Sequence, residues 1–197
     1  MKMDVVIIGV GGQGTLLASR ILGALADLKG LDVKVSEVHG MSQCGGSVIT
    51  YVRVGSDIHS PMVDLGGADV VLAFEQVEAL RALPYLKRGG VMIVGDQKIN
   101  PLSVITGQAA YPEGALDALR QQCRVLSLDA LSIAREAGEV RSVNLVLLGV
   151  LCAYLGEDPE LWHEAVARVV KSAFLEVNLK AFDAGRRHYE ESEERNG

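Results

Sequence analysis

Cysteine is scarce in this chain, with three cysteines among 197 residues: Cys44, Cys123 and Cys152. No two of them form a C-x-x-C pair. This pattern argues against a disulfide framework, a zinc ribbon or a complete iron–sulfur site within the chain, because a cubane cluster takes four thiolates. A redox centre, if the protein uses one, must be supplied by another chain.

Positive charge and long apolar runs are also lacking. The 19 Lys and Arg residues against 25 Asp and Glu give a formal net charge of −6, so nucleic acid is not an expected partner. The longest apolar run, residues 145–155, is interrupted by Gly149 and falls short of the roughly 20 residues that a bilayer span needs. The apolar start at residues 5–8 leads into glycines without a cleavage site, so we expect no membrane insertion, no export signal and a cytoplasmic location.

Glycine, in contrast, is abundant: 22 residues, clustered at 9–14, 40–46 and 66–67. Between these clusters short β-branched runs alternate with longer amphipathic stretches, which is typical of an α/β fold with a parallel sheet. The expected strands are residues 3–8, 33–38, 47–54, 69–73, 91–94 and 124–128, and the expected helices are residues 14–29, 74–86 and 115–122 and one begun at Asp129. We therefore predict a Rossmann-like three-layer α/β fold with a mostly parallel sheet and a helical C-terminal segment.

Residues 1–190 are expected to form a single domain, followed by an acidic, frayed tail at 191–197. Residues 95–112 carry several glycine and proline breaks and are expected to form an irregular loop with a short strand inside. In residues 161–177 an apolar stripe at helical spacing, wide enough for contact on two sides, is formed by Trp162, Val166, Val169, Ala173 and Val177.

The first glycine cluster, GVGGQG at residues 9–14, fits the G-x-G-x-x-G pattern with a strand before it and a helix after it. Gly9 permits the tight turn, Gly11 lets the backbone approach a ligand, and Gly14 allows close helix–strand packing. The helix N-terminus offers free N–H groups to an anion. A purely structural role, a close strand–helix turn without a ligand, stays open.

One alternative is a nicotinamide-dependent oxidoreductase. Such an enzyme needs an acidic residue at the end of the second strand to bind a ribose hydroxyl, and Glu37 is the candidate. The polar, glycine-rich loop that follows, residues 39–46, crowds the position where an adenosine would lie. Adenylating enzymes of the ubiquitin-activating type are disfavoured because their cysteine set and acid-rich segment are lacking.

The segments GVGGQG, EVHGMSQCGGSV, LAFEQVEALR and YLKRGG together resemble the small (beta) subunit of indolepyruvate:ferredoxin oxidoreductase. They also resemble the gamma subunit or domain of the wider 2-oxoacid (pyruvate and ketoisovalerate):ferredoxin oxidoreductases. The likeness runs from Met1 to about Pro112 and continues more weakly through Asn144 and Gly149. It implies oxidative decarboxylation of an aryl 2-oxoacid such as indolepyruvate to an acyl-CoA, with electrons passed to ferredoxin.

In this family the resemblance implies a large (alpha) subunit that carries thiamine diphosphate, Mg and [4Fe-4S] clusters, while coenzyme A is a co-substrate. The chain itself would bind no cofactor alone and would be nearly inactive alone. Its Gly95-Asp96-Gln97 departs from the G-D-G that opens a thiamine diphosphate site. A homodimer is a possible state of the isolated chain.

The resemblance also assigns candidate binding residues. They are Gly9, Gly11, Gly12, Gln13 and Gly14 in the first loop and His39, Gly40, Met41, Gln43, Gly45 and Gly46 in the second. Cys44 stands where the family usually has an arginine, which puts a charged contact from that position in doubt. His39 is a candidate acid–base group or, alternatively, a hydrogen-bonded loop residue.

Other polar residues have simpler interpretations. His59 is expected in a turn and His163 on a helix surface. Glu75 and Glu78 are candidate partner contacts, although the simpler expectation for Glu78 is a surface pair with Arg81. Asp96 follows a predicted strand, at the edge where α/β sheets bind ligands. Beside the enzyme subunit and the nicotinamide enzyme, a non-catalytic assembly module remains a third hypothesis.

Overall fold

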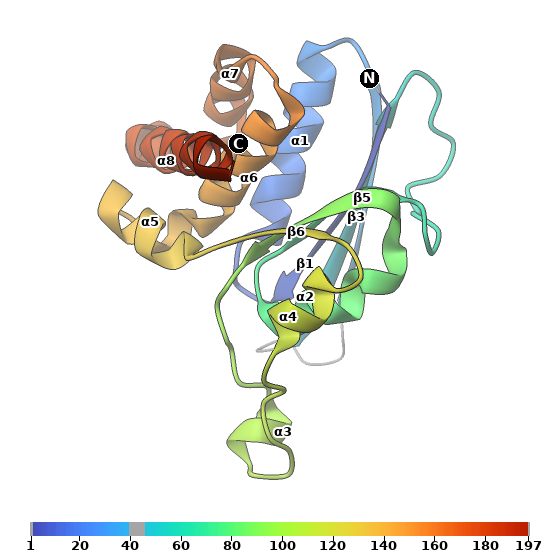
Figure 1. Cartoon of the computed structure of the whole chain (residues 1–197). Helices are drawn as coiled ribbons and strands as arrows, with labels where there is room; N and C mark the ends of the chain where they lie inside the picture. Colours follow the sequence, from blue (N-terminus) through green and yellow to red (C-terminus); the bar gives the residue numbers. More distant parts are fainter. Residues whose placement is uncertain (1, 40–45, 197) are drawn as a thin grey trace.

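The computed structural model describes residues 2–39 and 46–196. Its strands form one six-stranded sheet (Figure 1). They are β1 (Met3–Val10), β2 (Asp32–His39), β3 (Ser47–Gly55), β4 (Ala68–Ala73), β5 (Leu86–Gly95) and β6 (Arg124–Leu128). All six predicted strands are confirmed, and β5 begins five residues earlier than predicted.

The helices are α1 (Thr15–Leu28), α2 (Gln76–Ala82), α3 (Leu102–Ile105), α4 (Ala115–Arg120), α5 (Ala130–Ala137), α6 (Val143–Leu155), α7 (Pro159–Val169) and α8 (Ser172–Asn196). Short 3₁₀ turns are η1 (Leu83–Tyr85) and η2 (Val140–Ser142). In the described part of the chain, none of these helices combines the length and apolar content needed to span a bilayer.

The strand order is β2-β3-β1-β4-β5-β6. β1, β4, β5 and β6 run parallel, whereas β3 is antiparallel to both β1 and β2. The mostly parallel sheet is thus confirmed. β3 lies between the first two strands of the chain, which separates β2 from β1 by a full strand.

Helices cover both faces of the sheet, as the predicted three-layer fold requires (Figure 1). Successive β1 residues face opposite sides: Val5 and Ile7 join the core with α1 and α6, whereas Val6 and Ile8 pack toward α2 and α4. Because both faces are covered, the β1 side chains are buried throughout.

α6 and α8 cross at unusually close range. A Cβ on Gly149 of α6 would lie 2.0 Å from the carbonyl oxygen of Phe182, and one on Gly185 of α8 would lie 2.0 Å from that of Val146. Gly149, which interrupts the apolar run of α6, therefore marks the crossing with α8. Residues 143–152 are buried on every side of α6, so this apolar helix belongs to the protein core.

Two expectations about the connections were wrong. Between Gly95, which ends β5, and Pro112 the chain forms the short helix α3 and no strand. The stripe over 161–177 is divided between α7 and α8, because Val170 adopts an extended conformation that lets the chain turn back onto α6. Helix α7 still packs on two sides, against α1 and α8. At the acidic end, α8 continues to Asn196 with its last turns largely exposed, and the frayed tail at 191–197 stays a prediction.

Candidate functional site

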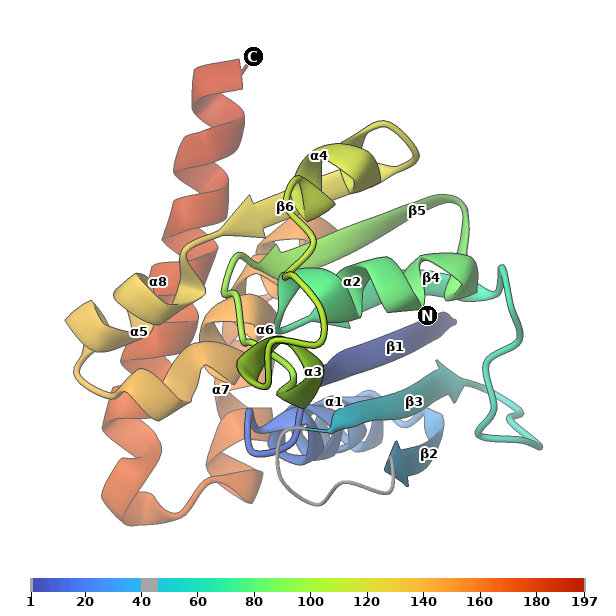
Figure 2. The same cartoon turned by 90° about the horizontal axis from the view of Figure 1, so that it is seen from below.

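The carboxyl ends of the parallel strands meet at one edge of the sheet (Figure 2). The first glycine loop, residues 9–14, follows β1 at this edge. Glu75 and Gln76 follow β4, Asp96 and Gln97 follow β5, and Asp129 follows β6. This is the edge at which open α/β sheets bind ligands.

Gln13 holds the first glycine loop in place. Its Oε1 accepts a hydrogen bond from the backbone N–H of Val10 (2.7 Å), and its Nε2 donates to the carbonyl oxygen of Phe74 and to Gln97 Oε1, both at 3.2 Å. Gly9 leaves room for this side chain, since a Cβ there would lie 2.8 Å from Gln13 Oε1. Gln13 thus connects the ends of β1, β4 and β5, and its role as a binding residue stays a prediction.

The two predicted loops meet. The backbone N–H of Gly11 donates to the carbonyl oxygen of Gly46 at 3.0 Å, so residues 35 positions apart in the sequence become neighbours. His39 ends β2 in register with Val48. Gly40, Met41, Gln43, Cys44 and Gly45 lie outside the described residues.

The N-terminus of α1 opens onto the same edge. Gly14 is left-handed (φ 86°), and no side chain caps the helix. Gly12 is also left-handed (φ 97°), and a Cβ there would meet open space. Asn144, at the start of α6, donates through Nδ2 to the carbonyl oxygen of Gly14 (3.3 Å) and fills the space that a Gly14 side chain would need.

Glu75 anchors the segment that carries α3. Its carboxylate is 1% exposed; Oε2 accepts from the N–H groups of Val77 (2.7 Å) and Glu78 (2.9 Å) at the start of α2. Oε1 accepts from the N–H of Ile99 (3.2 Å) and from the Tyr111 hydroxyl. Both ends of residues 98–114 are therefore fixed to one buried carboxylate. Burial, and then the bond to Glu75, raise the pKa of the Tyr111 hydroxyl.

Glu78 is not the surface residue that we predicted. The pair with Arg81 is present at 3.5 Å, but the Glu78 carboxylate is buried and accepts a 2.5 Å hydrogen bond from the Ser47 hydroxyl. Ser47 begins β3, directly after Gly46. Glu78 thus steadies the end of the second glycine loop, and Glu75 is a buried cap and not an exposed partner contact.

Asp96 and Asp129 bring negative charge to the far end of the edge. Burial, and then the Asp129 charge, raise the pKa of Asp96. Asp129 caps α5 by accepting from the N–H of Ser132 (2.9 Å). A hydrogen bond with the Ser132 side chain, and then this backbone bond, lower the pKa of Asp129. Asp96 is the acidic group at this edge whose charge the fold disfavours.

The position of Glu37 argues against a dinucleotide site. Glu37 is in register with Thr50 of β3, and Thr50 with Ile7 of β1. In a dinucleotide-binding fold the acidic residue ends the strand next to the first one. Here β3 moves Glu37 one further strand spacing, about 4.8 Å, from the first glycine loop.

The remaining histidines have structural environments. His59 is exposed in a segment without regular secondary structure, where its Nε2 lies 3.3 Å from Asp57 Oδ2. His163 is partly buried between α7 and α8, where its Nε2 lies 2.8 Å from Asp183 Oδ1. It therefore joins two helices and is not a free surface residue.

Among the residues that the structure describes, nothing fits the Mg ion or the [4Fe-4S] clusters that the resemblance implies for the whole enzyme. Cys152 is buried in α6, and burial raises the pKa of its thiol to about 12. Burial also raises the pKa of Cys123, at the opposite side of the sheet from α6. Over the described ranges, no cluster of three His, Cys, Asp or Glu residues could hold a metal ion. The edge instead presents backbone N–H groups, which suit an anionic group.

Sequence reasoning missed Tyr111, Gln97 and Ser47. Ser47 stands in the segment EVHGMSQCGGSV and Gln97 in Gly95-Asp96-Gln97, but their roles are not visible in the sequence because each of the three acts through a partner more than 30 residues away. Asn144 was noted only as part of the weaker likeness. Its contact with Gly14 could not be read from the sequence, because 130 residues separate the two.

Three kinds of comparison agree with this geometry. Residues 4–188 match the family model described as pyruvate ferredoxin/flavodoxin oxidoreductase. The chain is 43% identical to the indolepyruvate oxidoreductase subunit IorB of Pyrococcus horikoshii (93% of this chain, 94% of that one) and 40% identical to that of Archaeoglobus fulgidus (94% of each).

Solved structures share the fold. The gamma subunit of a keto/oxoacid ferredoxin oxidoreductase from Geobacter sulfurreducens superposes with a TM-score of 0.72 at 24% identity, over 96% of this chain and 99% of that one. In the 2-oxoglutarate:ferredoxin oxidoreductase of Magnetococcus marinus the match, with a TM-score of 0.72 and 20% identity, covers 96% of this chain but 31% of that one. The chain thus belongs to the pyruvate ferredoxin/flavodoxin oxidoreductase family.

Proposed function

We propose that this chain is the small subunit of an indolepyruvate:ferredoxin oxidoreductase, and that it completes an active site carried mainly by a larger subunit. The observation that carries the proposal is the meeting of the two glycine loops, through Gly11 and Gly46, at the open carboxyl edge of the sheet. The 43% identity to a curated indolepyruvate oxidoreductase subunit over nearly the whole chain supports the aryl 2-oxoacid as substrate.

The larger subunit would hold thiamine diphosphate, Mg and the [4Fe-4S] clusters, which supply the decarboxylation and the electron transfer to ferredoxin. The role of this chain is to bind and position. Gln13 fixes the loop after β1 and Glu78 fixes the start of β3, and the exposed peptide groups of Gly11 and Gly12 would face the partner. His39 remains the candidate for holding or moving a proton at this edge.

The first loop is proposed to contact a phosphate of coenzyme A. Gly12 is exposed, and the uncapped N-terminus of α1 adds the positive end of a helix dipole. The other binding candidates, Gly40, Met41, Gln43 and Gly45, belong to the same proposal.

The experiment is co-expression of this chain with the larger subunit from the same source, followed by an assay of indolepyruvate- and coenzyme A-dependent dye reduction. We expect the pair to be active and each chain alone to be nearly inactive. Activity of the larger subunit that this chain does not stimulate would refute the proposal, and tight NADH binding by this chain alone would favour the nicotinamide enzyme.

A matched pair of variants separates ligand contact from backbone strain. Gly12 and Gly30 are both left-handed with open space around the Cβ position, at opposite ends of α1. Both Gly12→Val and Gly30→Val impose the same kind of strain, but only the first places a side chain where a ligand approaches. We expect Gly12→Val to raise the KM for coenzyme A about tenfold or more beyond the change seen with Gly30→Val. Equal KM values for coenzyme A in the two variants would mean that this loop has a structural role only and does not contact coenzyme A.

A further inference from the structure

An apolar surface continues from the first glycine loop across the helical layer. It is formed by the first turn of α1, by η2 and by the turn between α7 and α8. We call it the α1–α8 surface: Leu17, Val169, Val170 and Phe174 line its hollow, and Leu16 and Val140 are exposed chain neighbours of lining residues. Leu16, Val140 and Phe174 are between 44% and 50% exposed, which is unusual for large apolar side chains gathered on three elements.

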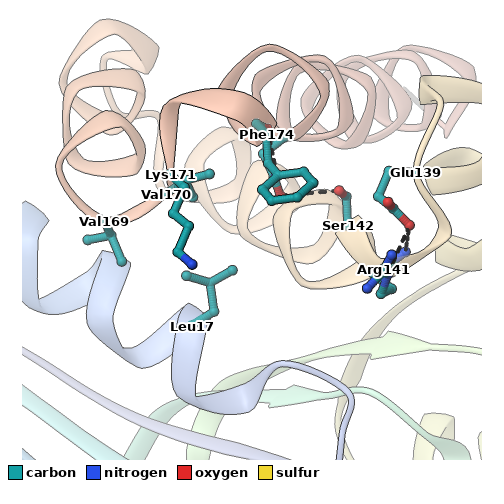
Figure 3. Close-up of a pocket in the computed structure, with 9 residues that line it drawn as sticks. Leu17, Glu139, Arg141, Ser142, Val169, Val170, Lys171 and Phe174 are labelled. Atoms are coloured by element: carbon teal, nitrogen blue, oxygen red, sulfur yellow. Dashed lines mark hydrogen bonds and ion pairs between the residues drawn. The ribbon is translucent and has the colours of Figure 1, made fainter.

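A hollow of about 310 Å³ lies within this surface (Figure 3). Leu17, Val169 and Val170 line one side, and the Phe174 ring stands over the hollow. At its inner wall Ser142 and Asn178, both buried, are joined by a 3.1 Å hydrogen bond, and Asn178 Nδ2 donates to the Phe174 carbonyl oxygen at 2.7 Å. The first of these bonds connects η2 to α8, so hydrogen bonds hold the inner wall of the hollow in place.

The rim of the hollow carries excess positive charge. Lys171 extends from the α7–α8 turn toward Leu17 (Figure 3) and makes no ion pair with any residue that the structure describes. Arg141 is largely exposed and its Nε lies 3.4 Å from Glu139 Oε1. The rim therefore carries two positive charges, on Lys171 and Arg141, and one negative charge, on Glu139. An acidic group of a partner would neutralise the excess positive charge.

We propose that the α1–α8 surface is the docking site for the larger subunit, which inserts an apolar anchor side chain into the hollow and places an acidic residue beside Lys171. This inference rests on the proposed function. An aromatic or aliphatic anchor in a hollow, surrounded by a charged rim, is the common arrangement of an interface hot spot.

Two observations favour the larger subunit over another occupant. First, the surface is continuous with the glycine loop, since Leu16 and Leu17 lie on the turn that Gly14 begins, so one partner can cover both. Second, this unit is also found within longer chains. The match spans 36% of the ketoisovalerate oxidoreductase subunit VorA of Methanothermobacter marburgensis and 31% of the Magnetococcus marinus chain. In those longer chains the unit is joined to further domains. A separate subunit has no such covalent link, so it needs a surface that binds the corresponding part of the larger subunit.

The experiment measures the affinity of this chain for the purified larger subunit by calorimetry. We expect Phe174→Asp and Leu16→Asp each to raise Kd by about 30-fold or more, as for hot-spot residues. The control is Leu65→Asp, because Leu65 is 70% exposed in the loop before β4, away from the α1–α8 surface. Since all three side chains are exposed, thermal unfolding of the variants should match that of the original protein.

The role of the positive charge at the rim is tested by reversing the charge of Lys171. We expect Lys171→Glu to slow association with the larger subunit severalfold at low salt, and we expect the difference to shrink as NaCl is added. A photo-crosslinking residue at position 174 should attach to a segment of the larger subunit that contains an apolar residue beside Asp or Glu.

The outcomes are distinct. If the unaltered chain does not bind the larger subunit, the proposed function fails. If it binds and both Asp variants bind within about twofold of it, this inference alone is wrong. If Phe174→Asp instead dissociates a dimer of this chain, seen by light scattering, while leaving the affinity for the larger subunit unchanged, the surface is a homodimer interface and the proposal is overturned.

Discussion

Gln13 and Gln97 join the loops after β1 and β5 through their side-chain amides, with Gln13 Nε2 3.2 Å from Gln97 Oε1. The same Nε2 donates to the Phe74 carbonyl oxygen, so a single side chain spans the loops that follow β1, β4 and β5. The loops at this edge of the sheet are therefore held in position by the chain's own hydrogen bonds, without a ligand or partner.

Replacing this side chain should loosen the site more than the fold. In Gln13→Ala three hydrogen bonds are lost, each with a net value of about 1 kcal/mol, at a half-buried position next to the loop. We expect dye reduction by the complete enzyme to fall about tenfold or more. Gln121→Ala, at an exposed position after α4, is the control and should retain activity. Equal activity of the two variants would mean that the loop is held by its backbone alone.

The crossing of α6 and α8 should not tolerate a methyl group. Gly149→Ala places a Cβ 2.0 Å from the Phe182 carbonyl oxygen, and the helices must separate to accept it. We expect a loss of about 3 kcal/mol in the free energy of unfolding, measured by urea denaturation.

The control for this change is the same substitution in α1. Gly23→Ala meets no atom within 4 Å and replaces a helical glycine, so it should stabilise the protein by about 0.5–1 kcal/mol. Effects of equal sign at the two positions would contradict the close approach of the helices.

The bond between Tyr111 and Glu75 should determine how firmly residues 98–114 are attached. Tyr111→Phe leaves the buried Glu75 Oε1 with one donor, the Ile99 N–H, and should lower the free energy of unfolding by about 1–2 kcal/mol. Limited proteolysis should cut the α3 segment faster. A double-mutant cycle with Glu75→Gln measures the coupling directly, and additive effects of the two substitutions would exclude the bond.

Asp96 should make stability depend on pH in an unusual direction for a carboxylate. Its pKa in the folded protein lies above the ordinary value of 3.8, so the folded state binds the proton more tightly than the unfolded state. The unfolding free energy that this group contributes is therefore greatest below pH 3.8 and decreases as the pH rises through the folded pKa.

Asp96→Asn removes this penalty. We expect the variant to be more stable than the original protein at pH 7, with the difference vanishing below pH 3.8, as measured by chemical denaturation across that range. Asp129→Asn keeps a capping oxygen but removes the neighbouring charge, so it should lower the pKa of Asp96 in an NMR titration. An unchanged pKa of Asp96 in this variant would show that burial alone raises the pKa.

Much of the secondary structure could be predicted because the signals are local. The β-branched runs gave all six strands, and the spacing of Leu17, Ile21, Leu25 and Leu28 together with the flanking glycines gave α1 within one residue at each end. The errors arose where tertiary packing decides. The chain leaves the helix at Val170 with no glycine or proline to signal it, because the reversal allows α8 to cross α6 at Gly149.

The sequence by itself determined the strand–loop–helix unit around residues 9–14 and the family likeness, because glycine spacing and apolar alternation act within a few residues along the chain. Only the tertiary structure decided that β3 separates β2 from β1, that Gly11 meets Gly46, and that Glu75 and Glu78 are buried anchors. The physical reason is that a hydrogen bond or an ion pair depends on distance in space. Pairs such as Gln13 with Gln97 and Asn144 with Gly14 are brought together by the packing of the whole sheet and leave no pattern in the order of the residues.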